Sequence, residues 1–176
     1  MNTIVVTIIV GIVVFVLTSI ASHISKKYFI CQPKVHIRFV YRGGHSSLDW
    51  NNEIRIAWNY DIIFENQTKY DAISIDIDFN SYPSQYITKQ KFSHLKGLSE
   101  ETLKLHFYKT YNRSIVEKSN DRFSELMPVE FSKAMILLTY SNEMNKNFYT
   151  MFIKNGNLEK NVFYKFKPKF DNYKDR

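Results

Sequence analysis

The chain has 176 residues, a formal net charge of +7 at pH 7 and a single cysteine, Cys31. This length gives room for one domain with a short appendage, and one cysteine excludes a disulfide within the chain. The sequence holds five glycines and contains no Walker loop, no Gly-x-Ser-x-Gly motif and no dinucleotide-binding pattern. We therefore expect a protein that is not an enzyme and that holds no cofactor and no metal.

The appendage is an apolar segment at the N-terminus. Residues 1–25 contain no Asp, Glu, Lys or Arg, and the run from Ile4 to Ala21 consists mostly of Ile, Val, Leu and Phe. About 20 such residues in a helix span a bilayer core of about 30 Å. A cleaved signal peptide is the alternative, although it would begin with positive charge and have a shorter apolar core. We predict a transmembrane helix over residues 1–25, anchored by Ile4, Val5, Ile9, Gly11, Phe15 and Leu17.

The charges that flank this helix predict its orientation. No basic residue precedes it, whereas His23, Lys26 and Lys27 follow it directly. The flank richer in Lys and Arg tends to stay in the cytoplasm. We expect the folded domain there, with the lipid bilayer as a partner. A juxtamembrane segment, 26–33, leads to a domain over 34–170, and a polar tail, 171–176, ends the chain.

The first half of the domain reads as strands. Residues 34–42 alternate in polarity, as in a half-buried strand, and 43–52 read as a loop. A second strand covers 53–66, and a shift of phase near Ile63 suggests a bulge or a change of partner. A third strand follows over 71–79, with the alternation starting at Ala72.

The third strand carries a possible metal motif. Asp76 and Asp78 form an Asp-x-Asp pair of the kind that can hold a divalent ion. They share the polar face of a strand whose other face is Ile73, Ile75, Ile77 and Phe79. A solvated face explains the two carboxylates more simply than a metal site does.

The second half of the domain ends in a regular pattern. Residues 132–141, 147–154 and 161–167 read as three strands joined by short Asn-rich turns, which predicts an antiparallel meander. The segment from Ser99 to Ile115 is ambiguous, because its apolar residues fit a helix capped by Ser99 and also fit a strand. We slightly favour one short helix there.

About seven short strands with strong alternation predict a mainly β fold: an antiparallel, immunoglobulin-like β-sandwich, with a small β-barrel as the alternative. Two stretches carry a family resemblance, "FENQTKYDAISIDI" over residues 64–77 and "LMPVEFSKAMILLTYSNEMNKNFYTMF" over 126–152. Through them the chain resembles small bacterial membrane-anchored proteins with an immunoglobulin-like sandwich. Since these patterns describe strands and turns, the resemblance implies a fold and no activity. The charged insert between Tyr82 and Glu125 departs from that pattern.

Two stretches interleave aromatic and basic residues, 108–113 and 163–170, as binders of single-stranded nucleic acid or nucleotides do. In a strand, however, Phe163, Lys165 and Lys167 share one face and Tyr164 and Phe166 share the other. The second stretch therefore reads more simply as core rings with exposed lysines. A basic domain beside anionic lipid gains about 1 kcal/mol per well-placed cation. The candidate contacts for a ligand or lipid are Lys26, Lys27, Lys109, Arg113, Lys165, Lys167 and Lys169.

The function that we expect is a single-pass membrane-anchored interaction module. It would act as an adaptor, sensor or accessory subunit of a membrane complex, for example in bacterial stress or anti-phage defence. Its partner would be another protein or a second copy of the chain, and the small-residue spacing Thr7-x-x-x-Gly11 permits close helix contact. The alternative is an effector gated by a nucleotide or nucleic acid, which assembles through its transmembrane helix. A nucleic-acid partner is not favoured.

Overall fold

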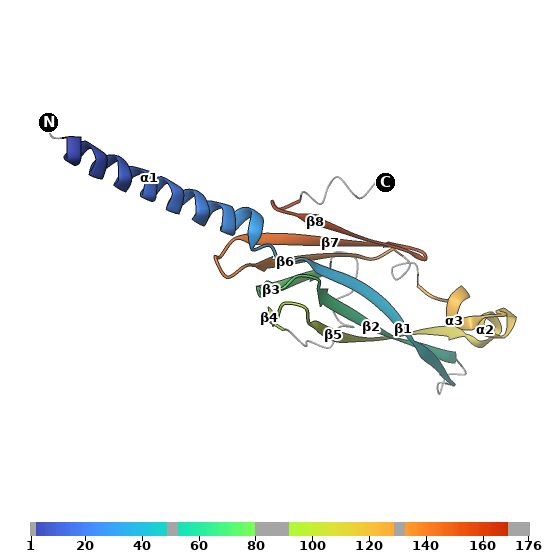
Figure 1. Cartoon of the computed structure of the whole chain (residues 1–176). Helices are drawn as coiled ribbons and strands as arrows, with labels where there is room; N and C mark the ends of the chain where they lie inside the picture. Colours follow the sequence, from blue (N-terminus) through green and yellow to red (C-terminus); the bar gives the residue numbers. More distant parts are fainter. Residues whose placement is uncertain (1–2, 49–52, 80–91, 129–132, 169–176) are drawn as a thin grey trace.

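The computed structural model describes residues 3–48, 53–79, 92–128 and 133–168. The protein is mainly β, with two antiparallel sheets and one apolar N-terminal helix that projects from one end of them (Figure 1). This helix, α1 (Thr3–Ser25), continues into one turn of π-helix, η1 (Lys26–Ile30). All residues from Val6 to Ile24 are exposed. The helix is long and apolar enough to span a membrane.

The strands form a three-stranded and a five-stranded sheet. The first has the order β1-β2-β5 and consists of β1 (Val35–Leu48), β2 (Glu53–Asn66) and β5 (Glu100–Asn112). The second has the order β4-β3-β6-β7-β8 and consists of β4 (His94–Leu95), β3 (Ala72–Phe79), β6 (Met135–Ser141), β7 (Asn147–Asn155) and β8 (Leu158–Tyr164). Neither sheet closes into a barrel within the described part of the chain. The predicted meander is confirmed as β6-β7-β8.

The two sheets share one hydrophobic core. Trp58 and Phe107 of the first sheet lie in the same cluster of buried side chains as Tyr140 and Phe152 of the second. Across the sheets, the ring of Phe39 stacks on that of Phe152 with centroids 5.2 Å apart. Burial of each large side chain stabilises the fold by about 1.5–3 kcal/mol. The alternate side chains of each strand that enter this shared core therefore hold the two sheets together.

The long hairpin at the start of the domain differs from the prediction in two ways. Residues 43–48 belong to β1 and are not a loop, because β1 keeps pairing with β2 as far as Leu48. The irregularity lies in β1, between Tyr41 and Gly43, where Gly43 has φ +110°. No phase shift occurs at Ile63, since β2 pairs with β5 in continuous register.

The helix favoured between Ser99 and Ile115 is wrong for most of its length. Residues Glu100–Asn112 form β5, in which alternate side chains, among them Leu103 and Phe107, are buried against the second sheet. The helix α2 begins only at Arg113 and ends at Lys118, and the short α3 (Arg122–Glu125) follows. Pairing with β2 decides between the two readings, and the local sequence does not contain that information.

The strands of the first sheet have 13 or 14 residues, and the main strands of the second have 7 to 9. At about 3.3 Å per residue, the first sheet extends about 20 Å beyond the second. The helices α2 and α3 lie at this end, which we call the far end, opposite α1 (Figure 1). The Trp58 indole N–H donates to the carbonyl of Phe123 at 2.7 Å, and the Tyr111 hydroxyl donates to that of Leu126. The α2–α3 segment therefore covers the overhanging apolar face.

Gly44 permits this cover, and its replacement by Ala should destabilise the protein. A Cβ at this position would lie 2.6 Å from the backbone oxygen of Ala57 and 2.7 Å from the Phe123 ring. Overpacking of this kind costs about 1–3 kcal/mol. We expect Gly44→Ala to lower the free energy of unfolding of the full-length chain in detergent by that amount. Ser47→Ala, on an exposed position of the same strand, is the control; an equal effect of both variants would contradict the packing of α3 on Gly44.

Candidate functional site

The end of the domain that meets α1, here called the helix-proximal end, contains η1, the start of β1, the β6–β7 turn and the end of β8. These segments come from three distant parts of the sequence. In Figure 1 the β6–β7 turn lies directly beside the end of α1. The helix-proximal end is where α1 and the folded domain are joined.

Asn142 joins the β6–β7 turn to η1. Its side chain is fully buried, and its Nδ2 donates to the carbonyls of Lys27 (3.0 Å) and Cys31 (2.8 Å). Its Oδ1 accepts from the backbone N–H groups of Met144 (3.1 Å) and Lys146 (2.9 Å). Both donor hydrogens and both acceptor positions of the amide are thus used. We call this set of four bonds the Asn142 clamp.

The π-helical turn supplies the clamp with its acceptors. The Cys31 N–H donates to the carbonyl of Lys26 at 2.9 Å, and the Gln32 N–H donates to that of Ile30 at 3.0 Å. The carbonyl of Lys27 therefore receives neither of these N–H groups and faces the amide of Asn142. The clamp and the π-helical turn depend on each other.

The first residues of β1 are bound to the second sheet by side chains. The Val35 N–H donates to the Tyr140 hydroxyl (3.4 Å), and the Thr150 hydroxyl donates to the Val35 carbonyl (2.8 Å). Burial raises the pKa of Tyr140, so its hydroxyl stays protonated. Two residues later, the Asn161 amide pairs with the backbone N–H and C=O of Ile37 at 2.8 and 2.9 Å. These bonds continue from η1 into the domain and cover the outer edge of β1.

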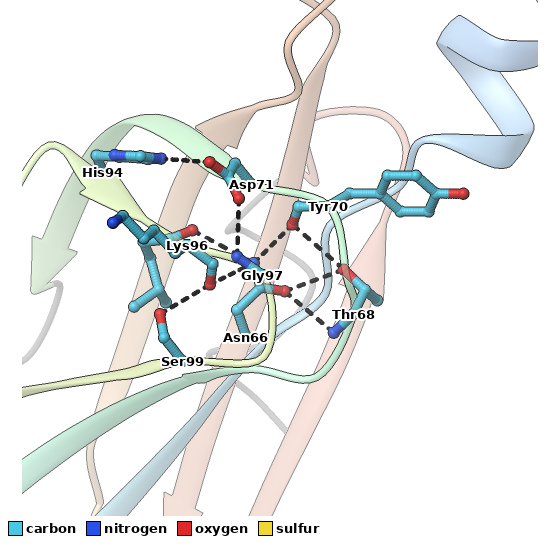
Figure 2. Close-up of polar contacts among 9 residues, drawn as sticks. Asn66, Thr68, Tyr70, Asp71, His94, Lys96, Gly97 and Ser99 are labelled. Carbon is cyan, nitrogen blue, oxygen red and sulfur yellow. Dashed lines mark hydrogen bonds and ion pairs between the residues drawn. The ribbon is translucent and has the colours of Figure 1, made fainter.

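A second buried amide, Asn66, holds the loops on the other side of this end (Figure 2). Its Nδ2 donates to the carbonyl of Tyr70 at 2.7 Å, and its Oδ1 accepts from the N–H (3.2 Å) and hydroxyl (3.0 Å) of Thr68. The Asn66 N–H donates to the carbonyl of Ser99 at 2.9 Å. The amide is therefore a structural element that joins β2 to the loops before β3 and β5.

Asp71 completes this cluster. Its carboxylate accepts from the Gly97 N–H at 2.8 Å and bonds to the His94 imidazole at 2.7 Å (Figure 2). These two hydrogen bonds, the backbone one first, hold the pKa of Asp71 below its usual value. Gly97 is required here, because a Cβ would lie 2.3 Å from the backbone of Lys69.

The surface of the helix-proximal end combines cations with exposed rings. The Lys146 ammonium lies 5.1 Å from the ring centroid of Tyr28 and 5.0 Å from that of Phe166. The Lys165 ammonium lies 4.7 Å from the ring of Phe29. Phe29 is 65% exposed and Phe166 is 75% exposed. The basic–aromatic surface, as we name it, comprises Lys26, Lys27, Tyr28, Phe29, Lys146, Lys165 and Phe166.

This surface corrects one prediction from the sequence. Phe166 is not a core ring, because β8 spans Leu158–Tyr164 and ends before it. The strand begins earlier than predicted, since Asn155 pairs with Leu158 across a two-residue turn with Gly156 at φ +60°.

The seven predicted contact residues do not form one surface. Lys26, Lys27, Lys165 and Lys167 lie at or near the helix-proximal end, whereas Lys109 and Arg113 lie toward the far end. Along β5, Lys109 comes nine positions after Glu100, the first residue of the strand, and nine positions of a strand span about 30 Å. There Arg113 pairs with Glu117 at 2.6 Å. Lys169 lies outside the described residues. The candidate contacts among the described residues therefore fall into two groups toward opposite ends of the domain.

Sequence reasoning missed Lys146, Tyr28 and Phe29. They lie in η1 and in a turn more than 110 positions later, and only the fold brings them together. Of the other candidates, Asp76 and Asp78 are exposed on β3. Among the residues that the structure describes, no three His, Cys, Asp or Glu side chains are placed to hold a metal ion.

Asn142→Ala should loosen the joint between α1 and the domain. The variant leaves two carbonyls and two N–H groups without their partner, and each such group costs about 1–3 kcal/mol where water does not replace it. We expect the free energy of unfolding to fall by about 2–4 kcal/mol. We also expect the distance distribution between spin labels at Ser22 and Lys160, in a Cys31→Ser background, to broaden. Asn147→Ala, an exposed Asn at the start of β7, is the control. An unchanged distribution in Asn142→Ala would contradict the clamp.

The Asp71 cluster predicts a dependence of stability on pH. A lowered pKa in the folded state means that ionised Asp71 stabilises the fold above the pKa of the unfolded chain, about 3.9. This stabilisation is lost as pH falls through the lower folded value. Asp71→Asn should therefore be less stable than the wild type at pH 7, and the difference should shrink below pH 4 in denaturant titrations. Asp76→Asn is the control; a difference that does not change with pH would contradict this assignment.

We compared the chain with protein-family models, with characterised proteins and with solved structures. None of the three comparisons gives a significant match.

Proposed function

We propose that this chain is a single-pass membrane-anchored interaction module that acts as an adaptor, sensor or accessory subunit of a membrane complex. One observation carries the proposal. An apolar helix, exposed on all sides, is bonded through the Asn142 clamp to a folded domain that begins within ten residues of its end. In water such a helix would be unfavourable, whereas in a bilayer its whole surface is matched by lipid.

The clamp also supports a fixed direction for the helix. Asn142 binds the carbonyls of Lys27 and Cys31, which lie directly after α1, so the end of the helix and the domain form one hydrogen-bonded unit. Lys26 and Lys27 support a domain on the cytoplasmic side of the cell membrane.

The strand order supports an immunoglobulin-like sandwich. In that fold the first, second and fifth strands share one sheet, and the third, sixth and seventh share the other. The order β1-β2-β5 and the run β3-β6-β7 have the same division. Here β4 pairs with β3 instead of β5, and β8 is an addition at the edge.

The far end supports an interaction role. Leu48 and Ile115 are exposed there, beside an open cleft of about 290 Å³ that is lined in part by Ile54 and Val116. The outer face of the first sheet is different, since it carries surface ion pairs such as Arg42–Asp61 at 2.7 Å. The exposed apolar side chains therefore lie where a protein partner above the membrane would reach them.

The alternative, an effector gated by a nucleotide or nucleic acid, has less support. Its two aromatic-basic stretches lie at opposite ends of the domain, so a single nucleic-acid tract of ordinary site size does not follow from their positions. Gating of the helix by a ligand would need one site that both stretches share.

Anchoring is tested by extraction of membranes that contain the full-length chain. We expect the protein to stay in the pellet after a wash at alkaline pH and to be released by detergent. A variant with Val13 and Val16 both replaced by Lys should leave the membrane fraction, since a charge at the centre of a span costs about 3 kcal/mol. Release of the wild type by the alkaline wash would refute the proposal.

The partner surface is tested with a photo-crosslinking residue at Leu48 or Ile115 in the intact membrane. We expect one adduct of defined mass from both positions. The same residue at Lys104, on the outer face of β5, is the control. Adducts of equal yield from all three positions would show that the far end is not the contact surface.

A further inference from the structure

A cleft lies between the second half of α1 and the β6–β7 turn. It has a volume of about 420 Å³, and its walls include Phe15, Ser19, Ser22, His23, Lys26 and Met144. The hydroxyl of Thr18 also borders it but bonds to the carbonyls of Val14 and Phe15 within α1. The remaining polar side chains are grouped at one end of the cleft, and Phe15 lies at the other.

This order of side chains matches the depth profile of a bilayer. If α1 enters the hydrocarbon core near Thr3, about 20 residues cross it, and the core ends near Ser22. Phe15 then lies at the depth of the acyl chains. Ser22, His23 and Lys26 lie at the depth of the headgroups. The acyl chains and the polar headgroup of a glycerophospholipid follow one another in the same order across the bilayer.

The charge around the cleft favours an anion. Lys26 lines it, and Met144, which also lines it, stands two residues before Lys146 in the β6–β7 turn. Lys27, Lys146 and Lys165 are the further cations of the basic–aromatic surface. Among the described residues of the β6–β7 turn, Glu143 is the acidic side chain that opposes them. The exposed rings of Phe29 and Phe166 suit the interfacial zone of a membrane, where aromatic residues are enriched.

We infer that the cleft and the basic–aromatic surface bind the headgroup phosphate of an anionic phospholipid from the bilayer that α1 spans. The inference rests on the proposed membrane anchoring and adds the lipid class and its site. The Lys26 ammonium and the Ser22 hydroxyl donate to the phosphate, and Lys146 approaches from the turn. Since the Asn142 clamp fixes the backbone of Lys146, a lipid bound here also fixes the domain against α1.

The test measures lipid retained by the full-length protein. Protein in detergent is mixed with phosphatidylglycerol or with phosphatidylcholine, and bound lipid is counted by native mass spectrometry. We expect a clear preference for phosphatidylglycerol in the wild type. Lys26→Gln combined with Lys146→Gln should reduce this preference about 25-fold, because each well-placed cation contributes about fivefold. Lys104→Gln combined with Lys118→Gln makes the same change of charge away from the cleft and should keep the preference.

Three results would overturn the inference. They are equal retention of both lipids by the wild type, an undiminished preference in the Lys26 and Lys146 variant, and displacement of phosphatidylglycerol by millimolar inorganic phosphate. Unfolding temperatures in phosphatidylcholine alone check that both double variants are folded. The alkaline wash separates the two hypotheses: a protein that stays in the membrane without lipid preference disproves only the lipid site, and one that is released disproves the anchoring as well.

Discussion

The buried amide of Asn142 is the interaction on which the arrangement of this molecule depends. Every residue of α1 from Val6 to Ile24 is exposed, so packing against the domain does little to fix the direction of the helix. The direction is instead set where α1 ends, by the two hydrogen bonds from the Asn142 amide to the carbonyls of Lys27 and Cys31, while two bonds to its Oδ1 hold that side chain in the β6–β7 turn. Because these bonds are buried and fully paired, the loss of any one leaves a polar group unsatisfied. A flexible linker would give a tethered domain, whereas this joint gives an oriented one.

A mismatch of sheet lengths shapes the opposite end. The three long strands extend beyond the second sheet, and without further packing the apolar side chains on their inner faces would be exposed to water. The α2–α3 segment provides that cover through Trp58, Tyr111 and the close approach of Phe123 to Gly44. The same segment brings Ile115 to the surface. The far end and the helix-proximal end are therefore built by different means, one by packing on an overhang and the other by buried amides.

The structural features that could be predicted from the sequence are those that depend on neighbouring residues alone. The apolar helix, the alternation of β3 and the meander of β6 to β8 are local patterns, and the structure has them. The spacing of Leu103 and Phe107 fits a helix and also fits a strand. The strand forms because β2 pairs with this segment, and that pairing is not a local property of the sequence. Asn66 ends β2 and Asn142 stands in the β6–β7 turn, and in the sequence both read as ordinary polar residues. Their roles depend on carbonyls of residues distant in sequence, Leu95 and Lys96 for Asn66, and Lys27 and Cys31 for Asn142.

The π-helical form of η1 follows from the same competition for hydrogen bonds. If residues 26–30 continued α1 as an α-helix, the Cys31 N–H would donate to the carbonyl of Lys27. In the π-helix it donates to Lys26 instead, at 2.9 Å, and the Lys27 carbonyl accepts from Asn142. An isolated π-turn is unfavourable relative to α-helix, so it requires an external partner to persist. Asn142 is that partner, because its two donor hydrogens reach the carbonyls of residues 27 and 31 together. The Asn142 turn, more than 110 residues later in the sequence, thus sets the geometry at the end of α1, and the change from α-helix to π-helix marks where the two segments meet.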